Sequence, residues 1–106
     1  MKWVCKVCGR VIESNERPIA CPLCGACSDY IVPGKDFKGI QKATKQKTVE
    51  NLNSALSLEK NATSLYEKFA KESREHGDDD AAMMFTALAR IEAGHQISIK
   101  KRLGQC

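Results

Sequence analysis

The chain lacks any long apolar run, which excludes a helix that spans a bilayer. None of its 106 residues belongs to a stretch near the roughly 20 consecutive apolar residues that such a helix needs. The start of the chain also lacks the apolar region of a secretory signal, because Met1 to Val4 lead directly into Cys5. We therefore expect no membrane partner and a cytoplasmic location.

The chain also has little that points to nucleic acid. Its net charge of +4 is modest. Most of that charge comes from one stretch that has no arginine and only Phe37 as an aromatic residue. We interpret residues 33–47 as a solvated basic linker and expect no nucleic-acid partner. The lysines of this stretch are Lys35, Lys38, Lys42, Lys45 and Lys47.

The first thirty residues have too little apolar surface to fold by burial alone. They nevertheless hold five of the six cysteines and two of the three prolines. In an intracellular protein, paired C-x-x-C spacing favours a metal site over disulfides. Residues 1–32 are therefore predicted to form a small metal-held domain of short strands and turns. Most of the remaining chain is rich in alanine, leucine, glutamate and lysine, which suits helices.

Two C-x-x-C-G segments form the predicted metal site. They are the first knuckle, residues 5–9, and the second knuckle, residues 21–25. Each glycine allows a backbone turn with positive φ that points amides at the sulfur atoms. Four thiolates can hold either zinc, as a redox-silent structural ion, or iron, as a one-electron relay, and spacing does not separate the two. The expected ligands are Cys5, Cys8, Cys21 and Cys24, with Trp3 packed over them.

Two cysteines lie outside this set. Cys27 could replace a ligand in a shifted register, but we expect it to be a small exposed residue because the second C-x-x-C pair is already complete. Cys106 is expected to fray at the chain end, with an intermolecular disulfide as the alternative.

Residues 48–106 are predicted to form a helical hairpin. Apolar residues recur at three- and four-residue steps from Thr48 to Glu75, which predicts the first helix. Gly77 suits the position after a helix end, and Asp78 to Asp80 suit the start of a second helix that runs to about Leu103. Two neighbouring apolar stripes on the first helix indicate contact with more than one element. The second stripe comprises Ala55, Leu58, Ala62, Leu65 and Phe69.

Three metal-ligating side chains should meet in this hairpin. Glu92 and His95 are three residues apart and share one helix face. Glu59 occupies an inward position where a carboxylate is unfavourable unless it is paired or bound to metal. In an antiparallel pair these residues lie at about the same level, at ~1.5 Å of rise per residue. The alternative is a surface glutamate on a helix that is rotated slightly. Tyr66 is either an ordinary core residue or a hydrogen-bond donor to a glutamate ligand.

This set is only half of a di-metal carboxylate site, which needs about four carboxylates and two histidines. A second copy of the chain, related by a twofold axis, would complete the set within a four-helix bundle. We therefore expect a homodimer or a higher even-numbered oligomer. Carboxylate and imidazole ligands suit iron or manganese.

The sequence here resembles the rubrerythrin family. The resemblance rests on residues 48–59, on Tyr66, on the Glu75-His76-Gly77 turn and on Glu92-x-x-His95. The amino-terminal segment resembles the family's rubredoxin-like domain in a short form, with twelve residues between the knuckles. Its position before the helices resembles the "reverse" arrangement. The resemblance implies a ferritin-like bundle formed by hairpins from two chains.

The sequence departs from the family pattern in three ways. The second hairpin that family members carry is missing. The extra glutamate one turn from a helix ligand has no counterpart, because Leu56 and Ala62 flank Glu59. Gly94 stands inside the metal-binding turn, where it lowers helix stability by ~1 kcal/mol relative to alanine. A close approach to the partner helix is one explanation for a glycine at this position.

The resemblance also implies a function. Glu59, Glu92 and His95 of each chain would hold a di-iron centre that reduces hydrogen peroxide, with Glu92 as the bridging ligand. Iron at the four cysteines would relay electrons from an external reductase. Two other functions stay open: a ferroxidase that handles iron, and a zinc-ribbon adaptor whose hairpin serves only for assembly.

Overall fold

The computed structural model describes residues 1–105, so the expectations for Cys106 lie outside the described residues. Three short strands form the small domain: β1 (Lys2–Cys5), β2 (Val11–Glu13) and β3 (Ile31–Pro33). They make one antiparallel sheet in the order β2-β1-β3. Two short 3-10 turns, η1 (Ser28–Tyr30) and η2 (Gly34–Asp36), flank β3. The predicted combination of a small strand domain and two packed helices is confirmed.

The core of the small domain is built around its cysteines. Cys5, Cys8, Cys21 and Cys24 are buried together with Trp3 and Ile31. The glycine after each knuckle has positive φ, +84° at Gly9 and +80° at Gly25, as predicted. The tight turn lets each glycine amide donate to the carbonyl oxygen of the first cysteine of its knuckle. A core this small is typical of a domain that a bound metal stabilises.

The rest of the chain is the predicted helical hairpin. Helix α1 (Gln46–Glu75) begins two residues before the predicted start, and α2 (Asp79–Arg102) ends one residue before the predicted end. Gly77 between them has a φ of +80°, which a glycine adopts without strain. Asp78 is the N-cap residue of α2, but its carboxylate accepts no capping hydrogen bond from the backbone amides of the first turn.

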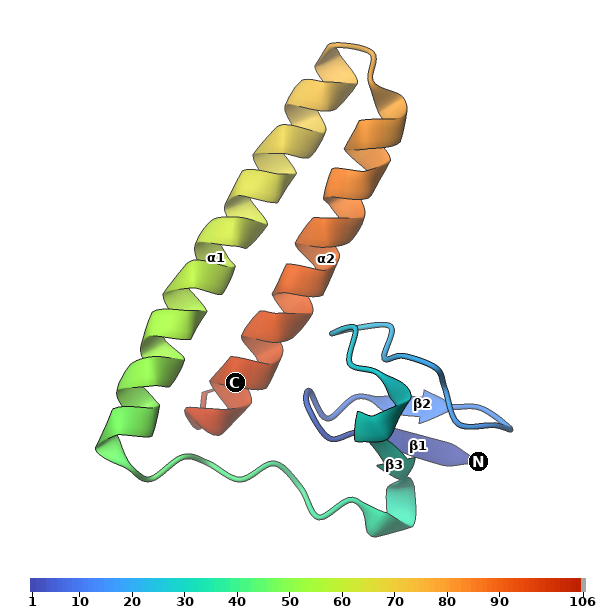
Figure 1. The fold of residues 1–106 in the computed structure, drawn as a ribbon, viewed down its shortest axis with the longest axis vertical. Helices are drawn as coiled ribbons and strands as arrows, with labels where there is room; N and C mark the ends of the chain where they lie inside the picture. The colour runs from blue at the N-terminus through green and yellow to red at the C-terminus, as the bar shows by residue number, and fades with distance from the viewer. Residues whose placement is uncertain (106) are drawn as a thin grey trace.

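The small domain lies beside the second half of α2, on the side away from α1 (Figure 1). From η2 the chain crosses below both helices to reach the start of α1. This segment contacts the end of α2, where the Ala43 amide donates to the carbonyl oxygen of Arg102 over 2.8 Å. The five lysines of the predicted linker are exposed, as expected for a solvated segment.

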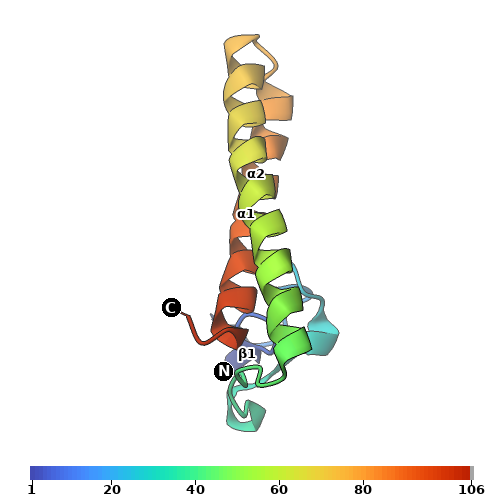
Figure 2. The same ribbon diagram turned by 90° about the vertical axis from the view of Figure 1, so that its left-hand side faces the viewer.

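The hairpin is a single layer of two helices, seen edge-on in Figure 2. The molecule measures 48 × 40 × 20 Å, with a radius of gyration of 15.9 Å. A compact domain of this length has a radius of gyration of about 13 Å. One layer of helices cannot enclose a core, so both broad faces of the hairpin are left open. Within residues 1–105, neither helix combines the length and apolar character that crossing a membrane requires.

Candidate metal centres

The four knuckle cysteines form a compact tetrad of sulfur atoms. Their Sγ atoms all lie within 4.8 Å of one another. The Cys5–Cys24 and Cys8–Cys21 sulfur pairs are 3.7 and 3.6 Å apart, and these cysteines are free thiols. A disulfide needs about 2.05 Å, whereas two thiolates on a tetrahedral ion with ~2.3 Å metal–sulfur bonds stand ~3.8 Å apart. The tetrad therefore fits one tetrahedral metal ion. Cys27 is exposed and outside it, as expected.

The ionisation of these four thiols is coupled to the presence of a cation. Burial raises the pKa of Cys8 to about 11, and burial likewise raises the pKa of Cys24. Burial opposes ionisation at Cys21 as well, but amide hydrogen bonds from Cys24 and Leu23 outweigh it and lower that pKa. Several buried thiolates repel one another, so all four can ionise together only with a cation among them.

The second cluster, Glu59, Glu92 and His95, lies between the two helices. Nδ1 of His95 is 3.3 Å from Oε2 of Glu59 and 3.2 Å from Oε2 of Glu92. All three side chains are half-buried, and their ligand atoms lie within 4.8 Å of one another. The structure thus brings together the three residues that the helical spacing predicted. They come from both helices, since Glu59 belongs to α1 and the other two to α2.

The tautomer of His95 decides what this cluster can bind. Nε2 of His95 lies 3.0 Å from the carbonyl oxygen of Cys24, which only accepts hydrogen bonds, so Nε2 carries the hydrogen. In a neutral ring, Nδ1 then presents a lone pair toward two carboxylates. Three electron-rich groups around one point repel one another unless a cation stands between them. The donor set and its orientation therefore fit a metal ion, of the kind that takes carboxylate and imidazole ligands.

Tyr66 lies in an aromatic group formed by residues of both helices. Its ring stacks on Phe85 at 6.3 Å and meets Phe69 edge-on at 6.5 Å. Within residues 1–105, its hydroxyl makes no hydrogen bond to Glu59 or Glu92. Its place two turns beyond Glu59 therefore puts its ring against Phe69 and Phe85.

The explanation offered for Gly94 was wrong in its partner. A side chain at Gly94 would overlap the carbonyl oxygen of Leu23 and lie 3.0 Å from Cα of Cys24. The close neighbour is therefore the second knuckle of the small domain, and no helix is involved. Sequence spacing could not reveal this contact, because 70 residues separate Cys24 from Gly94.

Lys101 and Arg102 have a role that their sequence positions do not reveal. Both lie in the last turn of α2, where the helix dipole favours cations, yet both donate hydrogen bonds to the first knuckle. The only signal in the sequence was a basic run in the last turn of α2, which the helix dipole already explains.

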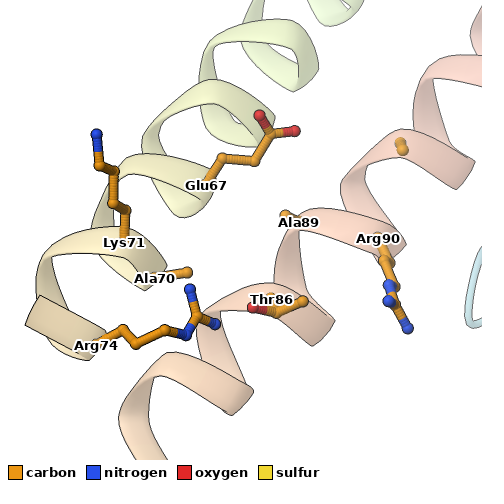
Figure 3. A pocket seen from close by; sticks show the side chains of 8 residues that line it. Glu67, Ala70, Lys71, Arg74, Thr86, Ala89 and Arg90 are labelled. Atoms are coloured by element: carbon orange, nitrogen blue, oxygen red, sulfur yellow. The ribbon is translucent and has the colours of Figure 1, made fainter. Parts of the chain in front are cut away.

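A groove of about 430 Å³ runs between the helices on the face of the hairpin away from the carboxylate–histidine cluster. In Figure 3, Arg74 reaches toward Thr86 while Lys71 extends away from the groove. Its floor is made of small residues, and its rim is charged, so this face suits contact with water. The lining residues are Glu67, Ala70, Lys71, Arg74, Thr86, Ala89, Arg90 and Ala93.

Comparison with known proteins agrees with both centres. The family model described as "Rubrerythrin, rubredoxin-like domain" matches residues 3–31, and the model "Rubrerythrin" matches residues 50–106. A curated relative, "Reverse rubrerythrin-1" of Clostridium acetobutylicum, is 26% identical over 98% of this chain. This chain spans 62% of that relative's length. No solved structure matches the chain at a comparable level of significance. A thiolate tetrad, a carboxylate–histidine cluster and two matching family models together lead to one conclusion: the chain belongs to the rubrerythrin family.

Proposed function

We propose that the chain is a peroxidase of the rubrerythrin type, with a di-iron site that forms where two copies meet. The observation that carries the proposal is the position of His95. Its Nδ1 faces Glu59 and Glu92, while its Nε2 contacts the backbone of the thiolate tetrad at Cys24. One imidazole thus connects a candidate one-electron centre to a candidate two-metal centre, which a purely structural zinc domain would not need.

Each chain supplies half of the ligands. One carboxylate from α1 and a carboxylate and an imidazole from α2 become four carboxylates and two imidazoles when two chains meet. The partner that completes the site is therefore a second copy of this chain.

The hairpin offers one face for this second copy. On α1, Ala55, Glu59, Ala62, Tyr66 and Phe69 recur at four- and three-residue steps, so the ligand and the aromatic residues share a stripe. On α2, Phe85, Leu88, Glu92 and His95 do the same. Large apolar residues beside these stripes are exposed, which is typical of an interface. They include Leu58 at 71%, Leu65 at 41% and Met84 at 47% exposure.

The opposite face is the groove with Glu67, Lys71 and Arg90 on its rim. Burial of those charges against another chain would be unfavourable without matched partners. The contrast between an apolar face that carries the ligands and a charged face that does not supports the first as the dimer interface.

When bound, two ferrous ions would supply the two electrons that convert hydrogen peroxide and two protons to two molecules of water, and iron at the thiolates would exchange single electrons with an external reductase. The chain's residues have distinct tasks around this chemistry. Glu59 and Glu92 hold charge in a half-buried site, and the Cys24 carbonyl fixes the His95 tautomer. The stacked rings of Tyr66 and Phe85 lie two helical turns from the ligands and pack the two helices together on that side.

Removal of one carboxylate tests the proposal. Glu92→Ala should abolish di-metal binding and lower peroxide turnover by at least a hundredfold, because the two ions lose a ligand from each chain. The visible absorbance of thiolate-bound iron should stay unchanged. Glu67→Ala, which removes a carboxylate from the groove face, is the matched control and should keep full turnover. Retained turnover in Glu92→Ala would rule out the assignment.

The choice of oxidant separates peroxidase from ferroxidase. Anaerobic protein loaded with ferrous iron is mixed with peroxide or with dioxygen in a stopped-flow instrument. We expect peroxide to oxidise the protein at least tenfold faster, and faster reaction with dioxygen would favour the iron-handling alternative. Zinc at the tetrad together with an empty bundle after anaerobic iron loading would favour the adaptor.

A further inference from the structure

We propose that Lys101 and Arg102 form a cationic clamp that holds the small domain on α2 and raises the reduction potential of the metal at the four cysteines. The inference rests on the proposed assignment of iron to the tetrad. It concerns residues at the end of α2 that contribute no ligand to either centre.

The two side chains of the clamp donate hydrogen bonds to backbone carbonyl groups of the first knuckle. Nζ of Lys101 donates to the carbonyl oxygen of Cys8 over 2.6 Å. The guanidinium of Arg102 donates from Nη1 to Val7 over 2.6 Å and from Nη2 to Lys6 over 3.1 Å. Three successive carbonyl groups of one knuckle are therefore bound by two positive charges. Hydrogen bonds from charged donors are about twice as strong as neutral ones.

The second knuckle is seated on the same helix by close packing. Gly94 lies directly under the Leu23 carbonyl group, and an added Cβ there would come within 2.7 Å of its carbon. An added Cβ at Gly25 would stand 3.8 Å from the side chain of Ile91. Both knuckles thus face α2, the second against Gly94 and Ile91 and the first against two cations. Together these contacts fix the orientation of the tetrad relative to the bundle ligands.

These cations are not used mainly to cap their own helix. Arg102 donates one further bond to Ser98 of α2 over 2.9 Å, but its other two bonds go to the small domain. The bond of Lys101 goes to the small domain alone. Lys100, in the same turn, makes no such side-chain bond within residues 1–105, so charge at the helix end and contact with the knuckle can be varied separately.

The effect on potential follows from charge. Iron with four thiolates has a net charge of −1 when ferric and −2 when ferrous, so nearby cations stabilise the ferrous form more. Hydrogen bonding and charge around such centres are recognised determinants of their potential. Lys101 and Arg102 are anchored on the backbone of a ligand loop, and the tetrad itself is buried. The clamp therefore makes the thiolate iron easier to reduce and holds it in position beside His95.

Potentiometric titration of the full-length, iron-loaded protein tests this proposal. We expect Lys101→Gln and Arg102→Gln each to favour the ferric form several-fold, and the double variant to do so on the order of tenfold. For a one-electron couple a tenfold change corresponds to about 59 mV. Lys101→Arg, which keeps the charge and a donor, should restore most of the potential. Lys100→Gln, which removes a charge from the same turn without a knuckle contact, is the matched control.

Amide hydrogen exchange supplies a second readout that does not depend on activity or on which metal fills the tetrad. The double variant should exchange faster than the parent at residues 6–9 and around Gly94, whereas Lys100→Gln should not. A double variant with the potential and the exchange of the control would overturn the clamp. Absence of peroxide turnover in the parent protein, with the potential shift still present, would remove the proposed function and leave the clamp standing.

Discussion

At the residue scale, Gly94 shows how a tertiary contact reverses a local preference. Helix propensity alone predicts that Gly94→Ala stabilises the chain by ~1 kcal/mol. The contact with Leu23 and Cys24 predicts the opposite, because the new methyl group would overlap the Leu23 carbonyl oxygen. Either the helix or the small domain must then move.

We expect Gly94→Ala to lower the unfolding midpoint of the full chain and to accelerate amide exchange in the second knuckle. Urea unfolding and hydrogen exchange measure the two effects. Ser57→Ala, at an exposed position of α1, should instead stabilise the chain by a few tenths of a kcal/mol, as propensity requires. A stabilised Gly94→Ala variant with unchanged exchange would show that the small domain does not rest on this glycine.

At the element scale, α2 contacts α1 and the small domain with different parts of its surface, and a third part carries the face proposed for a second copy. One side packs on α1, a second side holds the small domain through Gly94 and Arg102, and a third carries Leu88 with the candidate ligands. This explains why apolar and small residues are spread around α2 rather than confined to one stripe.

The apolar face leads to a prediction about assembly. Leu65→Asp would place a carboxylate in the proposed dimer interface, and we expect the dissociation constant to rise roughly 100-fold, about 2.8 kcal/mol at 1.4 kcal/mol per tenfold. Di-metal binding should be lost with the dimer. Analytical ultracentrifugation over a range of concentrations measures the change. Ser64→Asp, next in sequence but on the groove side, should leave the dimer intact, and equal behaviour of the two variants would count against this face.

At the scale of the whole molecule, we expect metal at the tetrad to supply much of the stability of the small domain. Its buried residues are few, and four of them are the cysteines. We expect a chelator with mild denaturant to unfold this domain while the hairpin keeps most of its helical circular dichroism. Trp3, the single tryptophan, is buried in the domain and reports its loss by fluorescence. Cys27→Ala should behave as the parent, since Cys27 is outside the tetrad.

Metal binding to the tetrad should also depend on pH in a defined direction. Burial raises the pKa of Cys8 to about 11, so near pH 7 this thiol holds a proton that the metal must displace. We therefore expect zinc or cobalt to release protons on binding and the apparent affinity to rise with pH. In the metal-free protein the effect of pH on folding stability has the opposite sign. The neutral Cys8 thiol stabilises the fold below pH 9, and this contribution is lost as the pH rises toward 11. Titrations in weak buffer and unfolding at pH 7 and 10 measure both.

The sequence by itself determined the elements and most of the candidate site residues. Knuckle spacing identified the four cysteines, and three- and four-residue periodicity located both helices to within two residues. The same periodicity put Glu59 level with Glu92 and His95, because an antiparallel hairpin fixes which residues lie opposite each other. These are local or nearly local regularities, which a chain of two helices and one turn preserves in its sequence.

Only the tertiary structure decided how the two domains meet. The seat of the second knuckle on Gly94, the bond from His95 to Cys24 and the clamp by Lys101 and Arg102 each join residues about 70 or more positions apart. The groups that accept these bonds are backbone carbonyls, which every residue has, so no side-chain pattern marks them. The orientation of the small domain therefore depends on shape and on hydrogen bonds to the backbone, and neither leaves a periodic signal in the sequence.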